Sequence, residues 1–392
     1  MIIVNIEDFF HPSAGYQINI LPKYLSKFGH KVYIITSQME KEPQSLTSFF
    51  GRDNIEILDK EYQEKYNIEI IRLPLKAFIS GRAIFTKELE KTIKQLNPDV
   101  LYVHGNDTFV GMWALLKQKK WKIPLVMDSH MLKMASKNRF NKIFHWFYRK
   151  VFTPKIVKHK IPIIRTQDDL YVEEVLGIPI GQAPWISYGS DTLLFYPNEE
   201  VKMAFREEYG IEKGGFVVVY TGKLDESKGG RLLAETFQKK FNVSKNVTLI
   251  VVGNTVGDYG REVDELFSKS ENRIIRFPTQ KYQDLAKFYQ IADLSVFAKQ
   301  CSLSFYDAQA CGLPVLSEDN NINIDRCSYN NGWNFKANDV DDFRAKIELA
   351  VNMETDKYKE VSDNAYNYII NKYNYEDKAR EYEAILCQAF EK

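Results

Sequence analysis

The sequence lacks several features that would assign it to other protein classes. Its four cysteines form no C-x-x-C pair and no cluster with histidine, so neither a zinc site nor a disulfide framework is expected. It contains no run of about 18 apolar residues, so no segment is expected to span a membrane. Basic and acidic side chains nearly cancel, at 53 against 52, which argues against a nucleic-acid partner.

Two further patterns are missing. The N-terminus begins directly as an apolar strand at residues 2–6, without the basic and apolar regions of a signal peptide, so a cytoplasmic protein is expected. No G-x-G-x-x-G follows any expected strand, which disfavours a dinucleotide-dependent dehydrogenase.

What the sequence does contain is a repeated α/β pattern. Short apolar runs rich in β-branched residues alternate with longer amphipathic stretches, which is typical of parallel strands covered on both faces by helices. Strands are expected at 2–6, 31–36, 68–73, 100–104, 125–128 and 161–166, and again at 216–222, 247–253, 274–277, 294–297 and 314–316.

A chain of 392 residues exceeds the usual size of one domain, and the pattern restarts after its midpoint. Gly, Asp and Pro break the periodicity between Tyr188 and Pro197, which predicts a linker there. We therefore expect an N-terminal Rossmann-like domain over 1–197 and a second over 198–365. Residues 366–392 are expected to form a helix that packs back toward the first domain.

Three stretches of the second half, taken in order, resemble the family-4 retaining glycosyltransferases. Residues 220–230 are similar to that family's strand, G-[RK]-L and K-G loop, and residues 276–293 to its base-contacting loop and Tyr-x-x-Ala-Asp helix. Residues 307–315 are close to its E-A-x-A-C-G-x-P-V motif. Weaker matches at 98–104, 128–130 and 188–191 extend the resemblance over nearly the whole chain.

The resemblance implies the GT-B fold, in which two Rossmann-like domains face each other across a cleft. It implies a nucleotide-sugar donor on the second domain, a saccharide acceptor on the first, and transfer with retention of configuration. No D-x-D motif precedes the expected donor site, so we expect no cofactor and no metal.

Sugar transfer from a nucleoside diphosphate needs positive charge beside the leaving diphosphate. Lys223 and Lys228 follow a buried strand and would supply it as flexible point charges, and the adjoining Gly229 and Gly230 would let backbone approach a ligand. The alternative is two solvated lysines beside a turn.

The segment from Lys299 to Asp307 is the expected seat of the donor. Ser302 is expected to cap a helix whose free N–H groups would face the diphosphate, as matching backbone amides do in the resembled family. By that resemblance Asp307 would hold the ribose hydroxyls. The expected donor-binding residues are Gly15, Gly222, Gly253, Phe277, Lys299, Gln300, Cys301, Ser302, Leu303 and Asp307.

Lys299 departs from the family pattern, because the resembled enzymes have a glutamate there that touches the donor sugar. Three explanations remain open: the donor sugar carries a carboxylate, the lysine itself binds phosphate or hydroxyl oxygens, or activity has been lost. In the second case Gln300 could also be the contact.

In the first half, Gly15 aligns with the family's Gly-rich loop, and His130 with a histidine near the reacting sugar carbon. His130, Lys223 and Lys228 are thus the expected catalytic residues. Asn106 and Asp107 follow a strand end and could face the acceptor, or could belong to a capped loop.

Residues 117–160 carry 13 lysine and arginine residues and one acid, Asp128. Phe140, Phe144, Phe147 and Val151 recur within this stretch at helical spacing, which predicts a basic amphipathic helix. Such a helix could contact an anionic membrane, or its aromatic residues could be core and its lysines merely solvated.

The sequence therefore predicts a retaining glycosyltransferase that moves a sugar to a saccharide acceptor, lipid-linked in our interpretation, in the assembly of a cell-surface polysaccharide. It is expected to work as a peripheral protein at the inner face of the cell membrane. A catalytically silent nucleotide-sugar binder or partner subunit, and an epimerase of the same fold, are the alternatives. The sequence names neither the base, the sugar, the acceptor nor the linkage.

Overall fold

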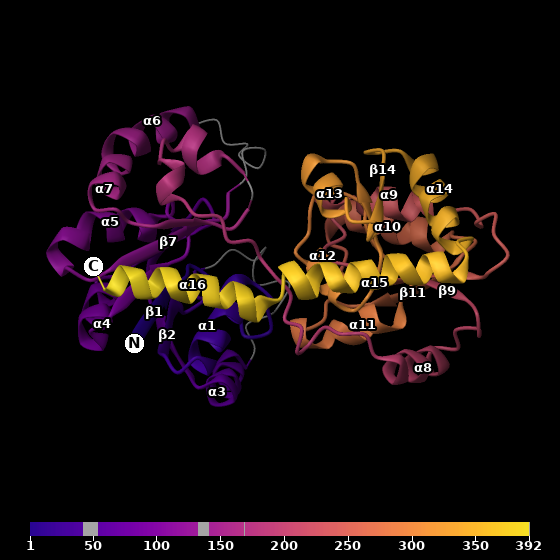
Figure 1. Ribbon diagram of the computed structural model, residues 1–392, viewed down its shortest axis with the longest axis horizontal. Coiled ribbons are helices and arrows are strands. Elements are labelled where there is room, and N and C mark those ends of the chain that lie inside the picture. The colour runs from indigo at the N-terminus through magenta and orange to yellow at the C-terminus, as the bar shows by residue number, and fades with distance from the viewer. Residues whose placement is uncertain (42–53, 132–140, 168, 392) are drawn as a thin grey trace. The chain divides into compact units, whose positions relative to one another are not determined.

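The computed structural model describes residues 1–41, 54–131, 141–167 and 169–391. The chain divides into two compact units, one made of Met1–Tyr188 with Glu376–Lys392 and the other of Gly189–Tyr375. Each unit is built around one six-stranded parallel sheet (Figure 1). Two parallel-sheet Rossmann-like domains were expected from the sequence, and this prediction is confirmed.

The first unit has strand order β3-β2-β1-β6-β7-β8. Its strands are β1 (Ile2–Ile6), β2 (Lys31–Ser37), β3 (Ile68–Leu73), β6 (Val100–Val103), β7 (Leu125–Ser129) and β8 (Ile163–Arg165), with a separate antiparallel pair β4 (Leu75–Ile79) and β5 (Arg82–Phe85). Its helices are α1 (Gln17–Lys27), α3 (Ile55–Tyr66), α4 (Glu88–Leu96), α5 (Phe109–Trp121), α6 (Asn141–Val151), α7 (Thr153–Lys158) and α16 (Tyr375–Phe390).

The second unit repeats this topology, with strand order β11-β10-β9-β12-β13-β14. Its strands are β9 (Phe216–Thr221), β10 (Val247–Val252), β11 (Arg273–Phe277), β12 (Leu294–Phe297), β13 (Val315–Glu318) and β14 (Gly332–Phe335). Its helices are α8 (Glu199–Glu208), α9 (Gly230–Thr236), α10 (Gly257–Ser268), α11 (Ala286–Ile291), α12 (Ser304–Ala310), α13 (Asn321–Arg326), α14 (Val340–Val351) and α15 (Thr355–Lys372).

The central strands form as expected because their side chains are buried on both faces. All six residues of β9 and of β10 are buried, and each sheet contributes to its own cluster of Val, Ile, Leu and Phe side chains. Strand order reverses between β1 and β6 in one unit and between β9 and β12 in the other. Ligands of open α/β sheets bind beside such reversal points, at the carboxyl ends of the strands.

The boundary between the units differs from the one expected near Pro197. The residues after Tyr188 pack with the second unit, because the Ser190 backbone exchanges hydrogen bonds with Tyr373 and Tyr375 and the Ser190 hydroxyl donates to Asp307. Ordinary turn residues give no sign of these long-range contacts.

The expected C-terminal helix of 366–392 is two elements. Helix α15 continues to Lys372 within the second unit, and α16 packs on the first unit from Glu376 onward. Its Glu383 contacts His30 at 2.7 Å, and its Arg380 guanidinium lies 3.4 Å from the ring centre of Phe28.

Two further elements were missed by sequence reasoning. The β4–β5 pair turns at Ser80 and Gly81, whose φ angles of 51° and 77° are positive, as short hairpin turns require. Strand β14 contains Gly, Trp and Asn and lies at the sheet edge, where burial imposes little apolar pattern.

Candidate donor site and polar edge cluster

A cluster of ionisable side chains lies at the carboxyl edge of the first sheet. Glu7 follows β1, His104 follows β6, and Asp128 lies near the end of β7. The Nδ1 atom of His104 is 3.2 Å from an Asp128 oxygen and 3.9 Å from a Glu7 oxygen. Parallel strands end at the same edge, which brings these three residues together.

Asp128 is the centre of this cluster and is fully buried. Its carboxylate accepts hydrogen bonds of 2.7 Å from the Tyr102 hydroxyl and from the Gly105 amide. Burial alone would raise the pKa of Asp128, but the neighbouring His130 and His104 lower it well below its usual range. The acid is therefore ionised.

His130 lies beside this carboxylate, with Nε2 at 2.8 Å from Asp128 and about a third of its side chain exposed. Its Nδ1 atom is hydrogen-bonded to the Tyr188 hydroxyl and lies 3.3 Å from the Thr166 hydroxyl. Burial would lower the pKa of His130, but Asp128 and Tyr188 raise it well above its ordinary value. The residue expected to be catalytic is therefore held as an imidazolium.

The same three residues could in principle hold a metal ion. Ligand atoms of His104, Asp128 and His130 lie within 4.8 Å of one another. Both Asp128 oxygens, however, already accept protein hydrogen bonds, from Tyr102 and Gly105. This donor set is more typical of a hydrogen-bonded network that orients His130 than of a metal site.

The structure places the two residues of the expected acceptor pair differently. Asn106 is fully buried, and its amide donates to the Tyr148 hydroxyl at 3.0 Å, so its side chain supports α6 from within. Asp107 keeps partial exposure and accepts a hydrogen bond from Tyr171. Gly15 lies in the loop between β1 and α1.

In the second unit, two glycines open the carboxyl ends of β9 and β10. Gly222 and Gly253 have φ angles of 143° and 154°. A Cβ atom on Gly253 would lie 1.9 Å from the Gly222 carbonyl oxygen, so the two loops approach more closely than any side chain allows. Both positions were expected at the donor site, and their backbone geometry requires glycine.

The loop after β9 brings Lys228 against the segment that follows β12. A short turn at Glu226–Lys228 is capped by Asp225, whose carboxylate accepts the Lys228 amide at 2.9 Å. The Lys228 ammonium donates to the Cys301 carbonyl at 3.3 Å, and burial lowers the pKa of Lys228. The carbonyl of Lys223 accepts the Tyr220 hydroxyl. Two stretches 73 residues apart thus meet where the strand order reverses.

Between β12 and α12 the backbone turns sharply. Gln300 has a φ of 58°, and its amide donates to Glu318 at 2.6 Å. Within the described ranges, the amides of residues 301–303 have no protein acceptor. Arg326, from α13, donates to the Ser302 carbonyl at 3.0 Å and lies over the rings of Phe305 and Tyr306.

Ser302 was expected to cap α12, and this was wrong by one residue. The helix begins at Ser304 and Leu303 occupies the cap position, although the Ser302 hydroxyl does accept the Ser304 amide at 3.3 Å. Arg326 was missed altogether, because no local pattern reveals that a helical arginine turns inward.

Asp307, one turn into α12, is buried. One of its oxygens accepts the Ser190 hydroxyl at 2.7 Å and the Tyr282 hydroxyl at 3.1 Å. Burial raises the pKa of Asp307 to about 7, although these two hydrogen bonds oppose the shift. Ser190 and Tyr282 were not predicted at this site.

The two remaining expected donor residues lie apart from that network. The ring of Phe277 packs among Tyr209, Phe205 and Phe288, so its side chain belongs to an aromatic cluster, and only its carbonyl faces Gly253. Lys299 is half-exposed, and its ammonium has no partner in the described part of the chain.

Comparison with known proteins decides the family. A model described as "Glycosyl transferases group 1" matches residues 201–368, and one described as "Glycosyltransferase Family 4" matches residues 17–159. The chain is a family-4-type glycosyltransferase of GT-B fold. The first match contains the donor loops described above, and the second contains His104, Asp128 and His130 of the polar edge cluster.

Similar proteins span nearly the whole of this glycosyltransferase. A probable sucrose-phosphate synthase of Thermosipho melanesiensis is 24% identical over 97% of the chain and 94% of its own length. A glycosyltransferase structure from Rickettsia africae superposes with TM-score 0.75 at 17% identity, covering 99% of this chain and 98% of the other. Anabaena HepE in complex with UDP and glucose has TM-score 0.74 at 15% identity, covering 99% and 100%.

Proposed function

We propose that this glycosyltransferase moves a sugar from a nucleoside-diphosphate sugar to a lipid-linked saccharide, with retention of configuration, during assembly of a cell-surface glycan. The observation that carries the proposal is the contact between Lys228 and Cys301 beside two glycine-opened loops. The likeness to HepE, which was solved with UDP and glucose, supports a nucleotide-sugar donor.

The residues of the second unit suit a departing nucleoside diphosphate. Lys223 and Lys228 would neutralise the charge that develops on it, and the amides of residues 301–303 would donate hydrogen bonds to its oxygens. Asp307, once ionised, would accept the ribose hydroxyls. Lys228 would exchange the Cys301 carbonyl for a phosphate oxygen, a change favoured by charge.

Retention would follow from attack on the same face of the sugar. The bond from the anomeric carbon to the phosphate oxygen breaks, the acceptor oxygen bonds to that carbon, and the acceptor proton passes to the leaving phosphate. The His130 imidazolium would serve as a hydrogen-bond donor on the acceptor side, and Asp107 as an acceptor contact.

We propose that the reaction needs no metal ion, because Lys223 and Lys228 would neutralise the charge of the leaving diphosphate. Activity should persist in excess EDTA. A loss that Mg²⁺ or Zn²⁺ restores would contradict this and would draw attention to His104, Asp128 and His130.

Lys228→Ala tests the donor site. Losing a donor to the leaving group should lower turnover by about 100-fold, as measured by release of free nucleoside diphosphate. Lys213→Ala, an exposed lysine before β9, is the matched control and should leave turnover unchanged. Unchanged turnover in Lys228→Ala would overturn the assignment. If nucleotide sugars bind but none is hydrolysed or transferred, the result favours the alternative hypothesis that the protein is a catalytically silent nucleotide-sugar binder.

Lys299 bears on the choice of donor. Its ammonium faces no protein carboxylate within the described chain, so it can meet a sugar carboxylate, a hydroxyl or a phosphate oxygen. Thermal-shift measurements with UDP-glucose and UDP-glucuronic acid separate these cases, since a bound ligand raises the melting temperature. A larger shift with the uronic-acid donor, lost in Lys299→Glu, would identify an acidic sugar.

Membrane contact is the second part of the proposal. Ile143, Trp146 and Phe147 are exposed on one face of α6, flanked by the exposed Lys142 and Lys150. Three further basic residues of this stretch, Lys133, Lys137 and Arg139, lie outside the described residues. None of the described helices is long and apolar enough to cross a bilayer. We propose that this face rests on an anionic leaflet at the cytoplasmic side, with each lysine contributing about 1 kcal/mol.

Vesicle co-sedimentation tests this contact. Wild-type protein should pellet with vesicles containing phosphatidylglycerol and less with phosphatidylcholine alone. Lys142→Glu with Lys150→Glu, or Trp146→Ser alone, should reduce pelleting. Equal pelleting on both vesicle types, or no effect of these changes, would remove the membrane from the proposal.

A further inference from the structure

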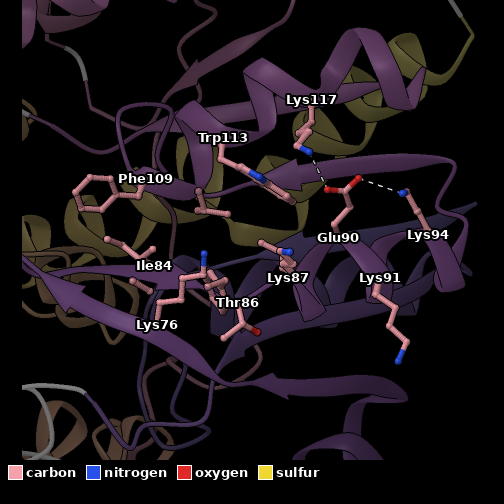
Figure 2. A pocket seen from close by; sticks show the side chains of 14 residues that line it. Lys76, Ile84, Thr86, Lys87, Glu90, Lys91, Lys94, Phe109, Trp113 and Lys117 are labelled. Atoms are coloured by element: carbon pink, nitrogen blue, oxygen red, sulfur yellow. Dashed lines mark hydrogen bonds and ion pairs between the residues drawn. The ribbon is translucent and has the colours of Figure 1, made fainter.

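The first unit contains a pocket that no part of the donor site or of the polar edge cluster uses. Its volume is about 600 Å³, and it is lined by the β4–β5 hairpin, α4 and α5 (Figure 2). All of these elements belong to one compact unit. Phe109, the first residue of α5, comes two positions after Asp107, so one lining residue is close in the chain to the expected acceptor contact.

The pocket is lined by an excess of lysines. Lys76, Lys87, Lys91, Lys94 and Lys117 line it together with one acid, Glu90. Glu90 is bonded to two of them, at 2.8 Å from Lys117 and 3.0 Å from Lys94, as Figure 2 shows. Hydrogen bonds from these two ammonium groups lower the pKa of Glu90 to about 2, so the acid is charged at neutral pH.

Two of the lysines have no counter-charge. Lys91 lies 3.8 Å from Glu88, whereas the ammonium groups of Lys76 and Lys87 have no hydrogen bond or ion pair within the described residues. They extend from different elements, β4 and the start of α4, toward one pocket. Unpaired cations around a concave surface attract an anion, and lysine is a common partner of phosphate.

The pocket is also lined by aromatic and aliphatic side chains. Phe109 and Trp113 lie one turn apart on α5, and Ile84 and Phe85 come from the hairpin. Phe109 is 37% exposed, and Trp113 is fixed by an edge-to-face contact with Trp121, at 4.8 Å between ring centres. Such a surface accepts the face of a sugar ring or a hydrocarbon chain.

We propose that this pocket binds a phosphate ester whose organic part lies on Phe109 and Trp113 while its phosphate meets Lys76 and Lys87. Two sources share this chemistry, a phosphorylated sugar and a prenyl phosphate. Because Phe109 of this pocket is two positions from Asp107 in the chain, we assign the bound molecule as the phosphate-bearing part of the acceptor. That role rests on the proposed transfer reaction, whereas the binding itself does not.

Tryptophan fluorescence tests the binding without any donor present. The probes are glucose 6-phosphate, farnesyl diphosphate and inorganic diphosphate. One of the organic phosphates should change the emission saturably, and Trp113→Phe should remove most of the change. Lys76→Ala with Lys87→Ala should weaken binding at least tenfold, and the weakening should shrink as salt is added. Both lysines are exposed, so the variant should melt like the wild type.

Lys119→Ala with Lys120→Ala is the matched control, because these exposed lysines lie at the end of the same helix outside the pocket. The proposal is overturned if this control weakens binding equally, if no probe binds saturably at millimolar concentration, or if inorganic diphosphate binds as tightly as both organic probes. The two proposals fail separately. If Lys228→Ala abolishes transfer and none of the three probes binds, the proposed reaction is supported and the proposed phosphate-ester pocket is refuted.

Discussion

The buried carboxyl group of Asp307 makes the stability of the second unit depend on pH in an unusual direction. Its pKa is raised to about 7, against 3.8 for an exposed aspartate. Between these values the folded protein holds a proton that the unfolded chain releases. Stability therefore falls by about 1.4 kcal/mol per pH unit as pH rises toward 7, and becomes constant above it.

Asp307→Asn removes this dependence, because asparagine resembles the protonated acid and cannot ionise. Between pH 5.5 and 8.5 the stability of the variant relative to wild type should rise by about 2 kcal/mol. This figure is about 1.4 kcal/mol per pH unit multiplied by the roughly 1.5 units that separate pH 5.5 from the folded-state pKa of about 7. For a unit of the size of Gly189–Tyr375 this corresponds to a relative gain in melting temperature of about 4 to 8 °C.

Differential scanning calorimetry at pH 5.5, 6.5, 7.5 and 8.5 measures this gain. Asp341→Asn, an exposed acid at the start of α14, is the control and should show no trend. Asp307→Asn should also bind the donor more weakly than wild type above pH 7, because wild-type Asp307 is then the carboxylate that accepts the ribose hydroxyls. A stability difference that stays constant over the four pH values would refute the buried, protonated state of Asp307.

Three further outcomes follow from the same contacts. Gly253→Ala should abolish nucleotide binding in calorimetric titration, because its Cβ would overlap the Gly222 carbonyl; binding like wild type would show that the loops can separate. Asp128→Asn should lower the pKa of His130 in an NMR titration, because the Asp128 carboxylate raises that pKa. In the wild type, the interaction of the His130 imidazolium with Asp128 stabilises the fold fully below about pH 6.5, and this stabilisation is lost as pH rises through the raised pKa of His130. Arg326→Ala should weaken nucleotide binding about tenfold (roughly 1.4 kcal/mol) by releasing the Ser302 carbonyl, and Arg326→Lys should restore it only in part; full affinity in the alanine variant would exclude a supporting role.

Much of the fold follows from local patterns. A buried parallel strand such as β9 or β10 must be continuously apolar, and the helices between strands must be amphipathic, so both sheets and their order along the chain are legible in the sequence. Neither the hairpin at Ser80 and Gly81 nor the edge strand β14 was predicted from the sequence. The hairpin depends on turn geometry, and β14 lacks a buried apolar pattern.

The sequence predicted which residues belong to the candidate site but not the contacts that their side chains make. The sequence indicated Gly222 and Gly253 at strand ends and Asp307 by its place in the family motif. The structure gives the reason for the two glycines, because both have positive φ angles. Spacing could not show that the Asn106 amide turns inward to Tyr148, or that Phe277 joins an aromatic cluster. Those outcomes depend on packing against residues far away in the chain.

The sequence by itself determined the family, the two parallel sheets and the residues that their carboxyl ends carry, because periodicity and short motifs are local properties. Only the tertiary structure decided the charge states of Asp128, His130 and Asp307, because a pKa depends on burial and on partners from other strands. It also decided the lysine-lined pocket, because Lys76, Lys87 and Lys117 share one cavity only after the hairpin and two helices have packed together.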